Sequence, residues 1–141
     1  MINEKISFEK LINRALDIRK MSYAPYSNYT VGAALLTESG KVYTGCNIEN
    51  ASYGVTNCAE RTAFFKAISE GERKFSAIAI AGGIVEQAPV EYAYPCGVCR
   101  QVMQEFTNRN FNVIVAKSHT DYKVYRLEEL LPFSFGGESI R

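Results

Sequence analysis

The sequence has no excess of charge of either sign and no run of like charges. Its 141 residues hold 16 lysines and arginines against 15 aspartates and glutamates, so the formal net charge is only +1. A protein that binds a phosphate backbone needs a basic patch or stripe. The composition therefore argues against a nucleic-acid partner and is compatible with a small uncharged ligand.

The chain also lacks a long apolar segment at its start. Residues 1–10 contain Glu4, Lys5, Glu9 and Lys10 among isolated apolar residues, which is typical of neither a signal peptide nor a membrane-spanning helix. We therefore expect a cytoplasmic protein with no membrane partner. In a reducing cytoplasm, its four cysteines are expected as ligands, catalysts or buried small groups rather than as disulfides.

Repeats, low-complexity tracts and linkers are absent as well. A chain of 141 residues that is 47% hydrophobic has the size of one domain and can bury a core of ordinary size. We therefore expect a single domain over residues 1–141.

Apolar periodicity and turn residues predict an alternation of helices and strands. An opening pair of short strands is joined by the residues Glu38-Ser39-Gly40-Lys41, which favour a hairpin turn. After the hairpin, helices alternate with apolar strands, and this order predicts an α/β fold with a mixed sheet and helices on both faces. The predicted helices cover residues 8–21, 58–69, 95–107 and 127–131, and the predicted strands cover residues 31–36, 42–45, 75–81, 111–116 and 123–126.

Three cysteines are spaced as metal ligands. Cys96 and Cys99 form a Cys-x-x-Cys pair at a predicted helix start, which places both sulfur atoms within reach of one ion. Redox dithiols have the same spacing, so the pair alone is ambiguous. Cys58, at the start of another predicted helix, can supply a third thiolate, and the positive ends of two helix dipoles favour thiolates there.

Three protein ligands leave a position for water, which is the mark of a catalytic zinc site. With Cys46 as a fourth ligand the site would be closed, and the protein would be a non-catalytic zinc-binding module. We favour the open site because Cys46 ends an apolar strand, where a buried bystander thiol is common. Glu60, two residues after Cys58, can serve as the general acid and base of a metal hydrolase, or it can simply complement the helix dipole.

Two other segments each have two interpretations. Residues 23–29 form a proline-broken loop with three tyrosines, whose rings either pad the core or offer one ring to stack on a flat ligand. Asn47-Ile48-Glu49-Asn50 follows a predicted strand and is, on its chemistry alone, more typical of a turn than of a binding site.

The pattern resembles the zinc-dependent nucleoside and nucleobase deaminases, in the all-cysteine form of their signature. Cys-Ala-Glu at 58–60 and Pro-Cys-x-x-Cys at 95–99 carry the resemblance. It narrows to the small homotetrameric cytidine deaminases through motifs spread over nearly the whole chain: Tyr-x-Pro-Tyr-Ser at 23–27, Val-Gly-Ala-Ala-Leu at 31–35, Asn-Ile-Glu-Asn at 47–50, Cys-Ala-Glu-Arg-Thr-Ala at 58–63, Cys-Arg-Gln at 99–101 and Glu-Leu-Leu-Pro at 129–132.

The resemblance implies a three-layer α/β/α fold with a five-stranded mixed sheet. It also implies one Zn²⁺ per subunit on Cys58, Cys96 and Cys99, with Glu60 as proton shuttle. The implied reaction is the hydrolytic deamination of cytidine and 2′-deoxycytidine in pyrimidine salvage, through a zinc-activated water. A deaminase of blasticidin S or a related nucleoside analogue shares most of this signature and stays open as an alternative.

Further site residues are implied by the same resemblance. Asn47 and Glu49 are expected to hydrogen-bond the ribose, and Tyr29 to stand where the family usually has a phenylalanine against the pyrimidine. Arg61 is expected to offset the negative charge of the cysteine ligands. Tyr53 and Phe135 match positions through which neighbouring subunits of a homotetramer complete each other's active sites.

Two positions beside the predicted ligands complete the set. Ala59, between ligand and proton shuttle, is expected to let the pyrimidine edge approach the helix backbone. Tyr94 stands where a serine is common in the family, and the backbone carbonyl at this position is expected near the departing amino group, with the larger ring at the pocket rim.

Overall fold

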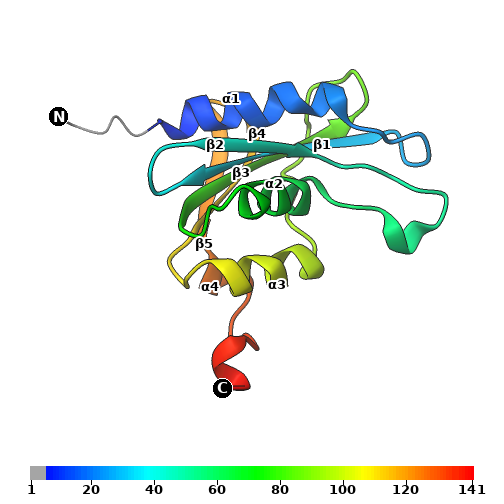
Figure 1. Cartoon of the computed structure of the whole chain (residues 1–141). Helices are drawn as coiled ribbons and strands as arrows, with labels where there is room; N and C mark the ends of the chain where they lie inside the picture. Colours follow the sequence, from blue (N-terminus) through cyan, green and yellow to red (C-terminus); the bar gives the residue numbers. More distant parts are fainter. Residues whose placement is uncertain (1–5) are drawn as a thin grey trace.

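The computed structural model describes residues 6–141 and contains one five-stranded sheet with helices on both of its faces (Figure 1). The expectation about residues 1–10 therefore falls partly outside the described residues. The strands are β1 (Tyr29–Thr37), β2 (Val42–Cys46), β3 (Phe75–Ile84), β4 (Asn112–Ser118) and β5 (Asp121–Arg126). The helices are α1 (Phe8–Ile18), α2 (Ala59–Ser69), α3 (Gly97–Phe106) and α4 (Leu127–Leu130), with 3-10 turns η1 (Arg19–Met21), η2 (Tyr53–Val55) and η3 (Gly137–Ser139).

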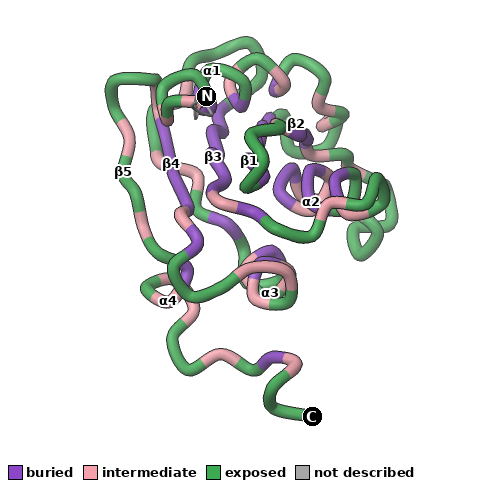
Figure 2. The backbone as a smooth tube through the Cα atoms, turned by 60° about the vertical axis from the view of Figure 1, so that its left-hand side comes forward, coloured by how far each residue is buried: buried purple, intermediate pink, exposed green. Residues whose placement is uncertain are grey.

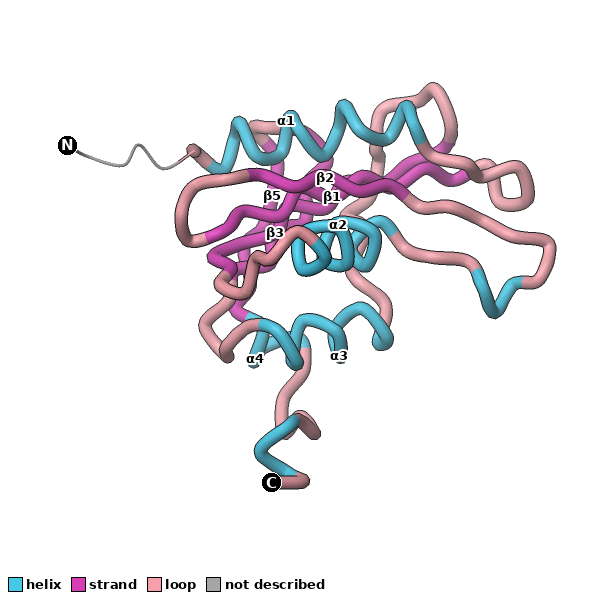
Figure 3. Tube along the Cα trace, viewed as in Figure 1, coloured by secondary structure: helices cyan, strands magenta, loops and turns pink. Residues whose placement is uncertain are grey.

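The sheet has the order β2-β1-β3-β4-β5. Only β3 and β4 are parallel, and the other three pairs are antiparallel. Helix α1 covers one face, while α2 and α3 lie on the opposite face (Figure 3). The prediction of a mixed sheet between helices is therefore confirmed.

Each central strand feeds two separate apolar cores, because successive side chains of a strand point to opposite faces. In β1, Leu35 packs on the α2 side and Leu36 on the α1 side. In β3, Ile78 and Ile80 face α2, whereas the alanines that alternate with them face α1. Burial on both faces explains why β3 and β4 are nearly continuous buried segments in Figure 2.

The strand boundaries differ from the prediction, and the differences in β1 and β3 are related. Strand β1 begins at Tyr29 rather than at residue 31, and β3 continues to Ile84 rather than ending at residue 81. These extensions pair with each other, with Tyr29 opposite Ile84. This pairing could not be predicted from local sequence patterns, because it joins residues that are far apart in the chain. In addition, the segment before β1 is broken by a proline and the end of β3 is rich in glycine.

Helix α2 is buried on one side only. Its buried side includes Ala63, Phe64 and Ala67, whereas Phe65 is 47% exposed.

Within residues 6–141, no helix combines the length and the apolar character needed to cross a membrane.

Helix α1 lies unusually close to β1 at Gly32. A Cβ atom built on Gly32 would lie 1.9 Å from the carbonyl oxygen of Ala15, so only glycine fits between the two backbones. The alanines of β3 that face α1 permit the same close approach.

We expect Gly32→Ala to destabilise the protein by about 1–3 kcal/mol, because α1 must move away from the sheet. Chemical denaturation followed by circular dichroism measures the change. Gly54→Ala is the control, since a Cβ at Gly54 meets nothing within 4 Å. Equal stability of the two variants would contradict the close contact.

Candidate metal centre

Two helices begin at the same place on one face of the sheet, and a cysteine stands at each beginning. Cys58 is the N-cap residue of α2 and Cys96 that of α3, both with extended backbone and neither with a side-chain capping bond. Pro95 precedes this N-cap rather than lying inside the first turn, where we expected it. The thiols thus occupy the positions at which the free N–H groups and positive dipole ends favour negative charge.

The third cysteine, Cys99, joins the other two from the first turn of α3. The Sγ atoms of Cys58 and Cys96 are 3.8 Å apart, those of Cys96 and Cys99 are 3.6 Å apart, and all three lie within 4.8 Å of one another. A tetrahedral zinc ion with Zn–S bonds of about 2.3 Å holds its sulfur ligands about 3.8 Å apart. The cluster therefore has the dimensions of a zinc site with three protein ligands.

Cys46 is not part of this cluster of described residues. It is a free, buried thiol at the end of β2, and burial raises its pKa. A buried protonated thiol is a poor metal ligand because zinc binds the thiolate. The geometry gives no support to the closed, four-cysteine site.

The electrostatic environment of the sulfur atoms also favours the binding of a cation. The hydrogen bond with Cys99, supported by those with Arg61 and Cys96, lowers the pKa of Cys58 to about 5, against the opposing effect of burial. The Nη2 atom of Arg61 donates to the Cys58 sulfur at 3.3 Å. Among three thiols so close together, each further proton is harder to remove because thiolates repel one another. A divalent cation relieves this repulsion, and Arg61 offsets part of the remaining negative charge.

Glu60 lies in the first turn of α2 and is only 4% exposed. Burial raises its pKa to about 7. The group of side chains within 4.8 Å of one another contains the three cysteines but not Glu60. Its carboxylate interacts electrostatically with Cys58 and Cys99, so it lies near the sulfur cluster but outside the group of possible ligand atoms.

Asn47 and Glu49 lie next to the start of α2. Two backbone hydrogen bonds of 2.9 Å join Ile48 to Asn57, the residue before Cys58. The amide of Asn47 accepts from the N–H of Val31 at 2.8 Å and donates to the carbonyl of Tyr29 at 2.9 Å.

The Glu49 carboxylate is bonded to the 23–29 loop. It accepts hydrogen bonds from the backbone N–H groups of Tyr26 and Ser27 and from the Ser27 hydroxyl. The Ser27 bond is the leading cause that lowers the pKa of Glu49. Both predicted ribose residues thus help to order the loop that leads into Tyr29.

The Tyr29 ring lies against the end of β3. A Cβ atom on Gly82 would be 2.9 Å from the ring and 3.0 Å from the side chain of Ala93, so glycine at position 82 makes room for the ring. Tyr29 is 36% exposed and is thus partly open to a ligand.

The Tyr94 ring is held at the surface by a hydrogen bond of 2.8 Å between its hydroxyl and that of Tyr125 in β5.

Ala59 has its methyl group in the core between α2 and the sheet and is fully buried. Its side chain is therefore a packing group.

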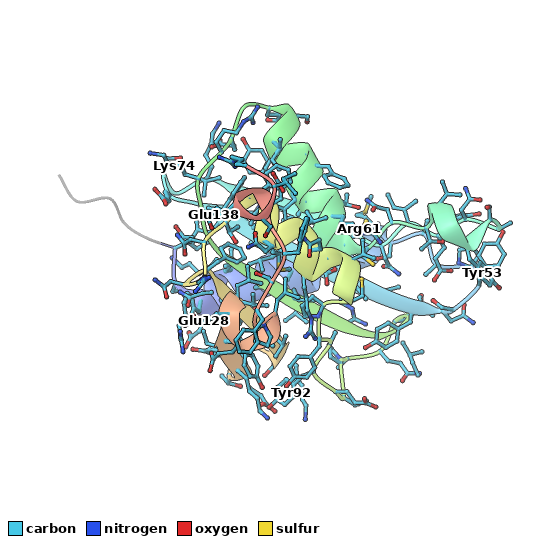
Figure 4. The ribbon with its side chains drawn as sticks, turned by 90° about the horizontal axis from the view of Figure 1, so that it is seen from below. Tyr53, Arg61, Lys74, Tyr92, Glu128 and Glu138 are labelled. Carbon is cyan, nitrogen blue, oxygen red and sulfur yellow. The ribbon has the colours of Figure 1, made fainter. Side chains whose placement is uncertain are left out.

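Tyr53 and Phe135 are both exposed in this chain. Tyr53 is 76% exposed on the projecting η2 segment, far from Arg61 in Figure 4, and Phe135 is 61% exposed on the C-terminal tail. The Phe135 carbonyl accepts a hydrogen bond from the side chain of Gln101 in α3.

Two contributors were missed by the sequence interpretation: Tyr125, which holds Tyr94, and Arg19, which is described below. A tyrosine on an edge strand and an arginine at a helix end carry no signal of their own.

Residues 6–115 match the family model of the cytidine and deoxycytidylate deaminase zinc-binding region. The chain is 47% identical over 132 residues to the cytidine deaminase of Sporosarcina psychrophila, covering 94% of this chain and 93% of that protein. It is 46% identical to that of Halalkalibacterium halodurans, covering 94% of this chain and 96% of that protein.

Among solved structures, the crystal structure of cytidine deaminase from Burkholderia pseudomallei superposes with a TM-score of 0.84 at 45% identity. The match covers 92% of this chain and all of that one. The expected fold is thereby confirmed, and the family model together with the cysteine cluster supports one zinc ion per chain.

We expect Cys96→Ala to lose the zinc ion and, with it, part of the stability, because metal binding and folding are coupled. Metal analysis of the purified protein and thermal unfolding before and after chelation measure both effects. Cys46→Ala is the matched control and should retain the metal; loss of zinc from that variant would show that Cys46 is a ligand.

Proposed function

The chain belongs to the family of zinc-binding cytidine and deoxycytidylate deaminases, and from this membership we propose that it is a hydrolase that converts cytidine and 2′-deoxycytidine to uridine and 2′-deoxyuridine. One observation carries the proposal: a buried carboxylate with a raised pKa stands beside three sulfur atoms at zinc-ligand spacing. A purely structural zinc site needs no such carboxylate, whereas a hydrolytic one does.

The sulfur atoms of Cys58, Cys96 and Cys99 would hold the zinc ion. With three protein ligands the ion supplies a Lewis acid that lowers the pKa of a water molecule towards about 7. Thiolate ligands are negative and weaken that acidity, so the hydrogen bond from Arg61 to Cys58 would help to restore it by drawing charge from the sulfur.

Glu60 would move the protons. It accepts a proton from the attacking water and delivers it to N3 of the pyrimidine, while the water oxygen bonds to C4. It then takes the second proton and passes it to the amino group, so that the C4–N bond breaks and ammonia leaves. Because its pKa is about 7, Glu60 can act both as base and as acid near neutral pH.

The substrate would lie between the start of α2 and the end of β3. Tyr29 would pack against the pyrimidine, and the backbone N–H of Ala59 and carbonyl of Tyr94 would contact its edge. Asn47 retains a second amide proton and Glu49 retains free lone pairs beyond their present bonds, so both can still bind ribose hydroxyl groups.

The exposed apolar residues support a homotetramer with shared active sites. Phe65 on α2, Tyr53 on the projecting segment and Phe135 on the tail are each about half exposed or more. A contact between subunits would remove these apolar side chains from water. In the assembly, Tyr53 and Phe135 would complete the site of a neighbouring subunit.

The compartment and metabolic role belong to the same proposal. Three free thiols bind zinc only while they stay reduced, which favours the cytoplasm. There the deamination would serve pyrimidine salvage.

A substrate panel with metal analysis tests the function. We expect loss of the ultraviolet absorbance of cytidine and 2′-deoxycytidine, and slower or no reaction with cytosine, CMP and blasticidin S. Glu60→Gln should retain zinc and lose activity by about 10²–10⁴-fold, since it cannot shuttle protons. Preference for blasticidin S, or full activity of Glu60→Gln, would overturn the substrate or the role of Glu60 respectively.

Coexpression of two inactive variants tests the shared site. Glu60→Gln lacks the proton shuttle and Phe135→Ala lacks the tail ring, so each homo-oligomer should have low activity. Mixed oligomers contain sites with Glu60 from one subunit and Phe135 from its neighbour, and activity should reappear. If mixed oligomers form and stay as inactive as the parents, the ring does not serve a neighbouring site.

A further inference from the structure

Arg19, at the end of α1, is a buried cation without a carboxylate partner among residues 6–141. It is 9% exposed, and the ion pairs of the described residues do not include it. Burial lowers its pKa, although a guanidinium remains charged in proteins. Burying a cation without a counterion is costly, so its position calls for an explanation beyond packing.

Its guanidinium binds two segments at once. The Nε atom donates to the backbone carbonyl and the hydroxyl of Thr30 in β1, at 3.1 and 3.3 Å. The Nη2 atom donates to the carbonyls of Ile84 and Gln87, at 3.2 and 2.9 Å. These last two residues are the ends of a turn closed by the hydrogen bond from the Gln87 N–H to the Ile84 carbonyl.

The structure around Arg19 is adapted to it. The Thr30 hydroxyl donates to the carbonyl of Gly83 at 3.2 Å, which links the start of β1 to the end of β3. A Cβ atom on Gly83 would lie 2.9 Å from Nη2 of Arg19. We call Arg19, Thr30 and the 84–87 turn the arginine clamp.

The clamp lies directly beside Tyr29. Tyr29 precedes Thr30 in the chain and pairs with Ile84 across the sheet. The clamp therefore fixes both of these neighbours of Tyr29. The ring itself occupies the space beside Gly82 and Ala93, near the end of the loop that leads into the Cys96 segment. On the other side, Asn47 holds the Tyr29 carbonyl.

We propose that Arg19 is a positioning residue that holds Tyr29 and the 84–94 loop in place for the pyrimidine. This inference rests on the proposed function, because it takes Tyr29 as the ring that contacts the base. An arginine is needed here because its rigid fork presents Nε to one segment and Nη2 to another, whereas a lysine has a single ammonium group.

Arg19→Met and Arg19→Lys test the proposal. Both should raise the KM for cytidine about tenfold, which corresponds to ~1.4 kcal/mol. Both should leave kcat within about threefold and zinc content unchanged, because a misplaced ring weakens substrate and transition state alike. Equilibrium binding of the product uridine should weaken by the same factor.

The control is Ile12→Val, a buried position on the same helix outside the clamp, which should lower stability without changing KM. Thr30→Val retains the strand backbone but removes the hydroxyl bonds, and it should raise KM in the same direction by a smaller factor. An unchanged KM in the Arg19 variants, or an equal rise in Ile12→Val, would overturn the proposal.

Hydrogen exchange separates this inference from the proposed function. In Arg19→Met, exchange at residues 84–94 should accelerate without any substrate present, and exchange in α2 should not change. If wild-type protein does not deaminate cytidine, the function fails while the exchange result still tests the clamp. Unchanged exchange at residues 84–94 would refute the clamp itself.

Discussion

The convergence of two helix N-termini on one face of the sheet is the constraint on which the site depends. Helices α2 and α3 are far apart in sequence, and only their docking on the same face brings Cys58 within 3.8 Å of Cys96. Each of these thiols stands at an N-cap without bonding to its own helix backbone. With three sulfur atoms placed together, the site becomes strongly negative when ionised, and both a cation and Arg61 have an electrostatic reason to be there.

Much of this arrangement follows from local sequence signals. Cys-x-x-Cys before an apolar helix and Cys-Ala-Glu at another helix start suffice to predict the two helix starts and the kind of ligand, whereas the full ligand set and the role of Glu60 rest on the resemblance to a family. The alternating pattern of helices and apolar strands predicts the layers. These features are predictable because each depends on residues within one or two helical turns.

Features that depend on distant contacts were not predictable. The outward ends of β1 and β3 pair only because Tyr29 meets Ile84 across the sheet. The methyl group of Ala59 lies in the core because α2 docks on the sheet. Arg19 is interpretable only from acceptors that lie 11 to 68 residues away. Local patterns gave the chemistry of the site, whereas long-range packing decides which side chains face it.

The contact between Gly32 and Ala15 also explains how Arg19 reaches its position. One helical turn of four residues from Ala15 to Arg19 advances about 6 Å, and two strand residues from Gly32 back to Thr30 span about 6.6 Å. The helix and the strand therefore advance by nearly the same distance here. The backbone contact fixes where α1 lies along β1, and the guanidinium consequently lies over the same face of β1 two strand residues further on. A single inserted residue between positions 15 and 19 would rotate Arg19 by about 100° around the helix axis, so this short stretch is a segment in which length itself is under constraint.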